Sequence, residues 1–219
     1  MKLPILKSAL FAFLFLVINS CREQIVPTEV ELSEYGWDMY TEGNYEEAII
    51  WFGEAIFEDS TYKDGFNGLL WAYGKTGELS KSLDNADEGM ILSDDINLVG
   101  TGHPTGTELL AGLALIQHAR ENYSDAVMMG DSLLSAVGDD DYVITSGVTS
   151  WQFSRDATID SKDIIWTLAS SQFVLGQFDS SLTRIKQLLF LPDDFNPVVS
   201  TVEGRSELAA QIEAVRSTI

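Results

Sequence analysis

The sequence predicts an all-α protein in which helical hairpins stack side by side into an α-solenoid. Three observations predict this class. The stretch 36–55 reads as a helix, a tight turn and a second helix. Ser82 repeats the place of Ala48 after an interval of 34 residues, a period typical of helical-hairpin repeats. Apolar residues recur at helical spacing around both positions, so each hairpin has one face to bury.

The first hairpin, roughly Glu29 to Tyr62, carries the clearest pattern. Thr28 to Glu31 is a capping box that predicts the start of its first helix. The small residues Gly36 and Ala48 allow the two helices to approach closely, and Phe52 fills the space beside them. This hairpin resembles the tetratricopeptide repeat (TPR), a helical hairpin of 34 residues. One such hairpin cannot bury its apolar face alone, so the resemblance implies neighbouring repeats.

The rest of the chain supplies the neighbours. A second hairpin runs from Lys63 to about Asp95. After a loop rich in Gly and Pro, 105–108 forms another capping box, and 121–126 repeats the turn pattern of 43–48. A fourth hairpin opens near Ser161, and a last amphipathic helix starts near residue 200. We therefore expect one TPR-like helical domain over 29–219, with about four hairpins and a C-terminal capping helix.

One insertion interrupts this array. β-branched and aromatic residues from Tyr142 to Phe153 flank Ser146-Gly147, which is typical of a short β-hairpin. An isolated hairpin is marginal in water, so this segment must lie on the helices or be an extended crossover. Asp139 to Asp141 precede it. They lack the spaced pattern of a calcium loop and are interpreted as a solvated turn.

The N-terminus has the features of a signal peptide over 1–20. Lys2 and Lys7 precede an apolar run over 9–18, which is too short to span a bilayer. The residues Ile18-Asn19-Ser20-Cys21 resemble a bacterial lipobox, in which the cysteine is lipidated. The alternative is an ordinary secreted protein with a chance cysteine. Cys21 is the single cysteine of the chain, so no intramolecular disulfide is available to it.

The lipobox resemblance implies a location. Residues 21–28 form a lipidated linker, and several acyl chains on Cys21 would hold the chain at a membrane. Arg22, rather than Asp, follows the cysteine. By similarity to enteric sorting rules, this implies the outer membrane of the bacterial cell envelope, with the protein facing the periplasm.

Composition excludes several functions. The formal net charge is −21, and loss of Lys2 and Lys7 with the signal peptide would make it −23, so nucleic acid and anionic membrane surfaces are repelled. His103 and His118 are the only histidines, and no further ligands accompany them at the spacing of a zinc site. No nucleophile elbow or Walker A sequence occurs. We expect no enzyme activity, no metal and no cofactor.

Aromatic residues mark a candidate binding groove. Trp71 lies 34 residues after Trp37, so the two occupy equivalent places in the first helices of their hairpins. In TPR proteins these helices line the concave face. The predicted groove residues are Trp37, Tyr40, Asn67, Trp71, Lys75, His118, Trp166 and Phe173. Trp and Tyr commonly anchor binding surfaces, yet the same aromatics also fit packing between repeats, and spacing does not separate these readings.

The resemblance to TPR lipoproteins implies a scaffold that binds an envelope protein or peptide through this groove. The groove lacks the Lys/Arg set with which chaperone-type TPRs hold a C-terminal carboxylate. The alternative function is a small-molecule or glycan-binding envelope lipoprotein, with the aromatics as stacking platforms.

Overall fold

The computed structural model of the chain describes residues 26–92, 105–137, 151–188 and 195–219. The expected signal peptide, Cys21, the Asp139–Asp141 turn and most of the expected β-hairpin lie outside the described residues. The described residues begin at Val26, immediately before the first capping box.

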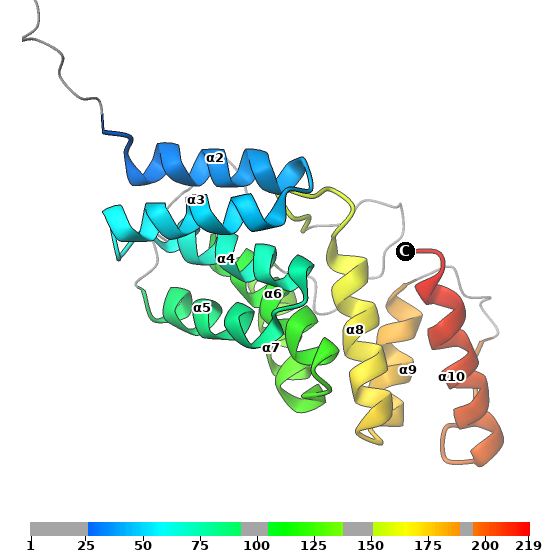
Figure 1. Cartoon of the computed structure of the whole chain (residues 1–219). Helices are drawn as coiled ribbons and strands as arrows, with labels where there is room; N and C mark the ends of the chain where they lie inside the picture. Colours follow the sequence, from blue (N-terminus) through cyan, green and yellow to red (C-terminus); the bar gives the residue numbers. More distant parts are fainter. Residues whose placement is uncertain (1–25, 93–104, 138–150, 189–194) are drawn as a thin grey trace, which may run out of the picture.

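Nine α-helices make up most of the described structure (Figure 1). In chain order they are α2 (Glu29–Thr41), α3 (Tyr45–Glu58), α4 (Lys63–Thr76), α5 (Leu79–Ile91), α6 (Thr105–Ala119), α7 (Tyr123–Val137), α8 (Ser161–Val174), α9 (Phe178–Gln187) and α10 (Val202–Arg216). Pairs from α2/α3 to α8/α9 are the four expected hairpins, and α10 packs on α8 and α9 as the expected cap. The capping box of Thr28 and Glu31 is present at the start of α2.

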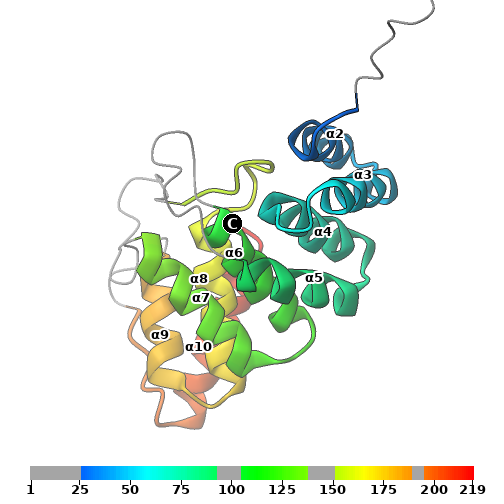
Figure 2. The ribbon, with the colours of Figure 1, turned by 90° about the vertical axis from the view of Figure 1, so that its left-hand side faces the viewer.

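The hairpins stack in sequence order, each second helix against the first helix of the next pair. The helix axes turn from the first hairpin to the last, as the two views show (Figures 1 and 2). The first helices α2, α4, α6 and α8 also contact one another in that order. We call the surface formed by these four helices the concave face. The arrangement confirms the predicted TPR-like α-solenoid.

Small residues hold the helices close together. A Cβ atom on Gly36 would lie 2.6 Å from the ring of Phe52, so this helix crossing admits only glycine. Ala48 is fully buried in the same hairpin. At the place of Ala48 in the second hairpin, the Ser82 hydroxyl donates to the Leu70 carbonyl oxygen at 2.7 Å. A small polar residue therefore replaces Ala without an unpaired hydroxyl.

The turns inside the hairpins share one backbone conformation. Gly43, Gly77 and Gly176 adopt φ angles of 75–80°, in the left-handed region that glycine occupies at little cost. Glu121 takes the same place in the third hairpin, with a φ of 64°. The third repeat keeps the turn geometry even though it lacks the glycine.

The segment before α8 departs from the repeat. Residues 151–160, which we call the crossover segment, form no strand in the described part of the chain, only a single antiparallel bridge between Gln152 and Asp160. This part of the insertion is therefore an irregular crossover. It passes alongside α4 and α6 toward α2 before α8 begins (Figure 2). Asp160 and Asp163 then form the capping box of α8.

Candidate functional site

The aromatic residues predicted to line the groove are on the concave face, but those of the first two hairpins are buried. Trp37 is 1% exposed, Tyr40 3% and Trp71 6%. Asn67 is fully buried beside them. The expectation that these side chains form an open aromatic surface is therefore wrong, because the crossover segment covers them. The same burial leaves Trp37, Tyr40 and Trp71 without an open face on which a glycan could stack.

Phe153 of the crossover segment makes the central apolar contact. Its ring stacks on Trp71, with centroids 4.1 Å apart and planes 17° apart. It also meets Trp37 and Tyr40 edge-on, at centroid distances of 5.9 and 6.2 Å. Offset stacking and edge contacts are the favourable geometries for aromatic pairs. Phe153, 1% exposed, therefore closes an aromatic cluster that spans α2, α4 and the crossover segment.

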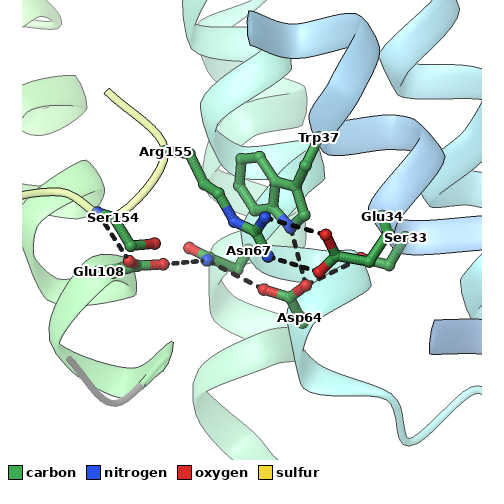
Figure 3. Close-up of polar contacts among 8 residues, drawn as sticks. All are labelled: Ser33, Glu34, Trp37, Asp64, Asn67, Glu108, Ser154 and Arg155. Carbon is green, nitrogen blue, oxygen red and sulfur yellow. Dashed lines mark hydrogen bonds and ion pairs between the residues drawn. The ribbon is translucent and has the colours of Figure 1, made fainter. Parts of the chain in front are cut away.

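A polar network lies beneath this cluster (Figure 3). The Asp64 carboxylate accepts hydrogen bonds from the Trp37 indole N–H and the Ser33 hydroxyl, both at 2.8 Å. The Trp71 indole N–H donates to Asn67 Oδ1 at 3.1 Å. The two equivalent tryptophans are thus held by different acceptors from α4. Buried indole N–H groups need such partners, so the network fixes both rings.

Glu108 links the helices to the crossover segment. One carboxylate oxygen accepts from Asn67 Nδ2 at 2.7 Å, and the other accepts from the backbone N–H of Ser154 at 3.2 Å. Burial raises the pKa of Glu108 above its ordinary value, although these hydrogen bonds favour the charged form. The sequence predicted that Glu108 would cap its own helix. Helix α6 instead already includes Thr105, and Glu108 is turned across to α4 and the crossover segment.

Two ion pairs tie the edge of the crossover segment to the first two hairpins. The Arg155 guanidinium donates twice to Glu34, at 2.7 and 3.1 Å, and lies 5.1 Å from the ring centre of Trp37. The hydrogen bond from Arg155 lowers the pKa of Glu34. Lys75, a predicted groove residue, contacts Asp156 at 3.4 Å. A cation and an anion of one segment thus meet opposite charges on α2 and α4.

The remaining predicted groove residues lie in the C-terminal half, where His118 and Trp166 contact each other. His118 Nδ1 is 2.9 Å from Ser171 Oγ, and its ring meets Trp166 edge-on. The Trp166 indole N–H donates to the Ile212 carbonyl oxygen of α10 at 2.8 Å, with Arg216 over the ring. Phe173 packs edge-on against Phe178 of its own hairpin. The structure therefore divides the predicted groove into an N-terminal and a C-terminal part.

Burial lowers the pKa of His118 below its ordinary value, and the nearby positive charge of Arg216 lowers it further. The neutral form of the ring is thus favoured in the folded protein.

A pocket of about 170 Å³ remains open on the concave face, between α4, α6 and the crossover segment. Apolar side chains and two glycines line it, with Lys75 among them; the lining residues are Leu70, Trp71, Gly74, Lys75, Gly112, Leu115, Ile116 and Ile159. A larger hollow of about 720 Å³ lies away from this face, between the start of α9 and the loop before α10.

Sequence reasoning missed the residues that cover the groove. Phe153 was interpreted as part of a hairpin strand, and Arg155 was not singled out. One signal was available: Arg155 is the first basic residue after Arg120, within a strongly acidic chain. An isolated cation flanked by Trp151 and Phe153 is typical of a segment that docks on an acidic, aromatic surface.

Across the described ranges, no group of three or more His, Cys, Asp or Glu side chains is arranged to hold a metal ion. Among the same residues, no helix combines the length and the apolar character that crossing a bilayer requires.

Comparison with known proteins identifies the fold. Neither a known protein family nor a curated protein matches the sequence. Two structures of MamA, one a mutant and one labelled AMB-1, are each 16% identical to this chain, with TM-scores of 0.54 and 0.55. The matches cover 85% of this chain and 90% and 85% of those chains.

A third solved structure is described as a tetratricopeptide repeat protein from Parabacteroides merdae. It is 18% identical with a TM-score of 0.54, and the match covers 88% of this chain and 62% of that chain. At these sequence identities the similarity shows the fold alone and gives no information about activity. The chain therefore has a TPR-like fold, as its helix packing had already indicated.

Proposed function

We propose that this protein is a lipid-anchored, non-enzymatic scaffold of the bacterial envelope that binds another protein on its concave face. The TPR-like fold supports the class of function, because stacked hairpins present an extended surface suited to binding a polypeptide. The signal-peptide pattern and the lipobox at Cys21 support the anchor. The acidic chain disfavours nucleic acid as the partner.

The observation that carries the binding site is the 170 Å³ pocket beside the crossover segment. Trp37 and Tyr40, which were predicted to bind, are covered, whereas this pocket stays open on the same face. Leu115 and Ile116 give it apolar walls, and Lys75 supplies a charge at its lining. It fits one apolar side chain of a partner, which would anchor a larger contact over α4 and α6.

A capture experiment tests the binding site. The full-length protein, cross-linked in detergent-solubilised envelope, is expected to retain a stoichiometric partner. Leu115→Gln should remove that partner while changing the melting temperature little, because Leu115 is only partly buried. Met128→Gln on α7, where the side chain is 53% exposed, is the matched control and should retain the partner. Equal capture by both variants would place the partner on another surface.

The anchor is tested independently. Cys21→Ala should release the protein from the membrane fraction, because the acyl chains would have no attachment site. Mass spectrometry of the native N-terminus should show the lipidated cysteine. A Cys21→Ala protein that remains in the membrane fraction would contradict the anchor and leave the scaffold proposal standing.

A further inference from the structure

The crossover segment lies on the concave face in the way that a bound peptide would lie. Four consecutive residues make contacts: the Phe153 ring, the Ser154 backbone N–H, the Arg155 guanidinium and the Asp156 carboxylate. We propose that the concave face of α2, α4 and α6 is a binding site for a short turn-containing segment of a partner protein. That segment carries an aromatic residue followed two positions later by arginine, and residues 153–156 are an internal occupant of its site.

The contacts divide into two kinds, one to the backbone of the segment and the others to its side chains. Glu108 accepts from a backbone N–H, which any residue except proline supplies. The specific contacts come from the flanking side chains. Trp71, Trp37 and Tyr40 surround an aromatic ring, and Glu34 receives an arginine through two parallel hydrogen bonds. The site therefore selects an aromatic residue and an arginine at this spacing.

The charge of the surface agrees with that occupant. The carboxylates of Glu34, Asp64 and Glu108 all act electrostatically on the Arg155 guanidinium. Glu34 remains 55% exposed and Arg155 30% exposed in their ion pair. Exposed ion pairs break at little cost, so this edge of the crossover segment is the place where a competing arginine would first enter.

The crossover segment is also an imperfect occupant. The hydroxyl of Tyr40 is buried beneath it and has no hydrogen-bond partner among the described residues. Tyr40 itself is 3% exposed and lies edge-on to Phe153. A buried hydroxyl without a partner is unfavourable, and a partner segment with a polar group beside its aromatic residue would satisfy it. Such a segment gains a hydrogen bond that residues 151–160 do not provide.

This inference rests on the proposed scaffold function, because it names the chemistry of the partner for the same concave face. Displacement of the crossover segment would also remove Ile159 from the wall of the open pocket. The pocket and the covered cluster are then two parts of one longer groove, of which only the pocket is open in the unbound protein.

The experiment exchanges the charges of the Glu34–Arg155 pair. The probes are a fluorescent peptide with residues 151–158 of this chain and a second peptide with Glu in place of its Arg. In full-length Glu34→Arg protein, the internal Arg155 is repelled, so the Glu-containing peptide should bind about tenfold more tightly than the unaltered one. Glu54→Arg, an exposed charge reversal on α3, is the matched control and should show no such preference.

A second variant leaves every groove residue intact. Arg155→Glu should loosen the crossover segment, so the unaltered peptide should bind it about tenfold more tightly than it binds the native protein. Hydrogen exchange supplies an independent reading: the amides of Phe153 and Ser154 should open more readily than those of Leu70 and Leu109.

Two results would overturn the inference. One is that folded Arg155→Glu and Glu34→Arg proteins bind neither peptide at about 1 mM. The other is that the amides of Phe153 and Ser154 exchange only on global unfolding, which would make residues 151–160 a permanent part of the core. Either result leaves the capture of an envelope partner through Leu115 unaffected, so failure here is distinguishable from failure of the scaffold proposal.

Discussion

The tryptophans in the two halves of the concave face are covered by different kinds of segment. In the N-terminal half, Trp37 and Trp71 are covered by the crossover segment, and their indole N–H groups bond to side chains of α4. In the C-terminal half, Trp166 is covered by α10, and its indole N–H bonds to a backbone carbonyl. The first cover is an irregular segment held by ion pairs. The second is a helix at the end of the array.

The difference shows that the repeats place aromatic residues on this face, whereas segments outside the repeats decide their exposure. Trp37 is 1% exposed beneath the crossover segment, while Trp166 is only partly buried. The 34-residue repeat does not determine which segment covers the aromatic residues of the concave face. The non-repeating parts of the chain therefore decide whether these residues line a binding groove or pack in the core.

The largest expected effect is on stability, and it tests the difference between the two tryptophans directly. Trp37→Ala should lower the free energy of unfolding by about 3–5 kcal/mol, because it empties a fully packed site. Trp166→Ala should cost roughly half as much, since its ring is only partly buried. Urea denaturation of both variants measures the two values. Equal costs would mean that α10 covers its half of the face as completely as the crossover segment covers the other.

A second effect concerns the polar network of the N-terminal half. Asp64→Ala removes the acceptor of both Trp37 and Ser33 and leaves their donors buried. We expect a loss of about 1–3 kcal/mol in the free energy of unfolding. Asp84→Ala, at an exposed position of α5, is the control and should change stability by less than about 0.5 kcal/mol. An Asp64→Ala protein as stable as the native protein would show that water replaces the carboxylate as hydrogen-bond acceptor.

A third effect belongs to the C-terminal half and depends on pH. The pKa of His118 is lowered on folding, so the unfolded chain binds a proton more readily than the folded protein. Stability should therefore be fully present above the unfolded pKa of about 6.5 and fall as the pH drops through the folded value. As the pH falls through that window, the melting temperature of the native protein should approach that of His118→Gln, which has no imidazole to protonate. A constant difference would mean that the ring does not titrate there.

The smallest expected effect is on the ion pair that holds the edge of the crossover segment. A double-mutant cycle of Glu34→Ala and Arg155→Ala should give a coupling energy of about 0.2–1 kcal/mol, because Glu34 is largely exposed. Added salt should reduce it. A coupling of several kcal/mol would mean that the pair is a principal anchor of the segment, and displacement by a partner would then be disfavoured.

The sequence predicted the helices well, because local signals specify them. The interval from Ala48 to Ser82, the turn glycines and the Thr28–Glu31 capping box all correspond to observed features. It did not predict the cover over Trp37 and Trp71. The contact from Arg155 to Glu34 joins residues 121 positions apart, and no local pattern encodes such a pairing. The Trp151 to Phe153 alternation suggested a strand, yet tertiary contacts determine its course.

That long-range contact has a consequence for how the protein unfolds. In an ordinary solenoid each repeat touches only its neighbours, so an end repeat frays without disturbing the others. Here residues 151–160 join the first hairpin to the start of α8, where Asp160 forms the helix cap. Melting of α2 would remove the contacts of Phe153 with Trp37 and of Arg155 with Glu34, while the cap of α8 is made within α8 itself. We therefore expect the crossover segment to lose protection no later than the first hairpin, and the first hairpin to form more slowly than in a purely local array.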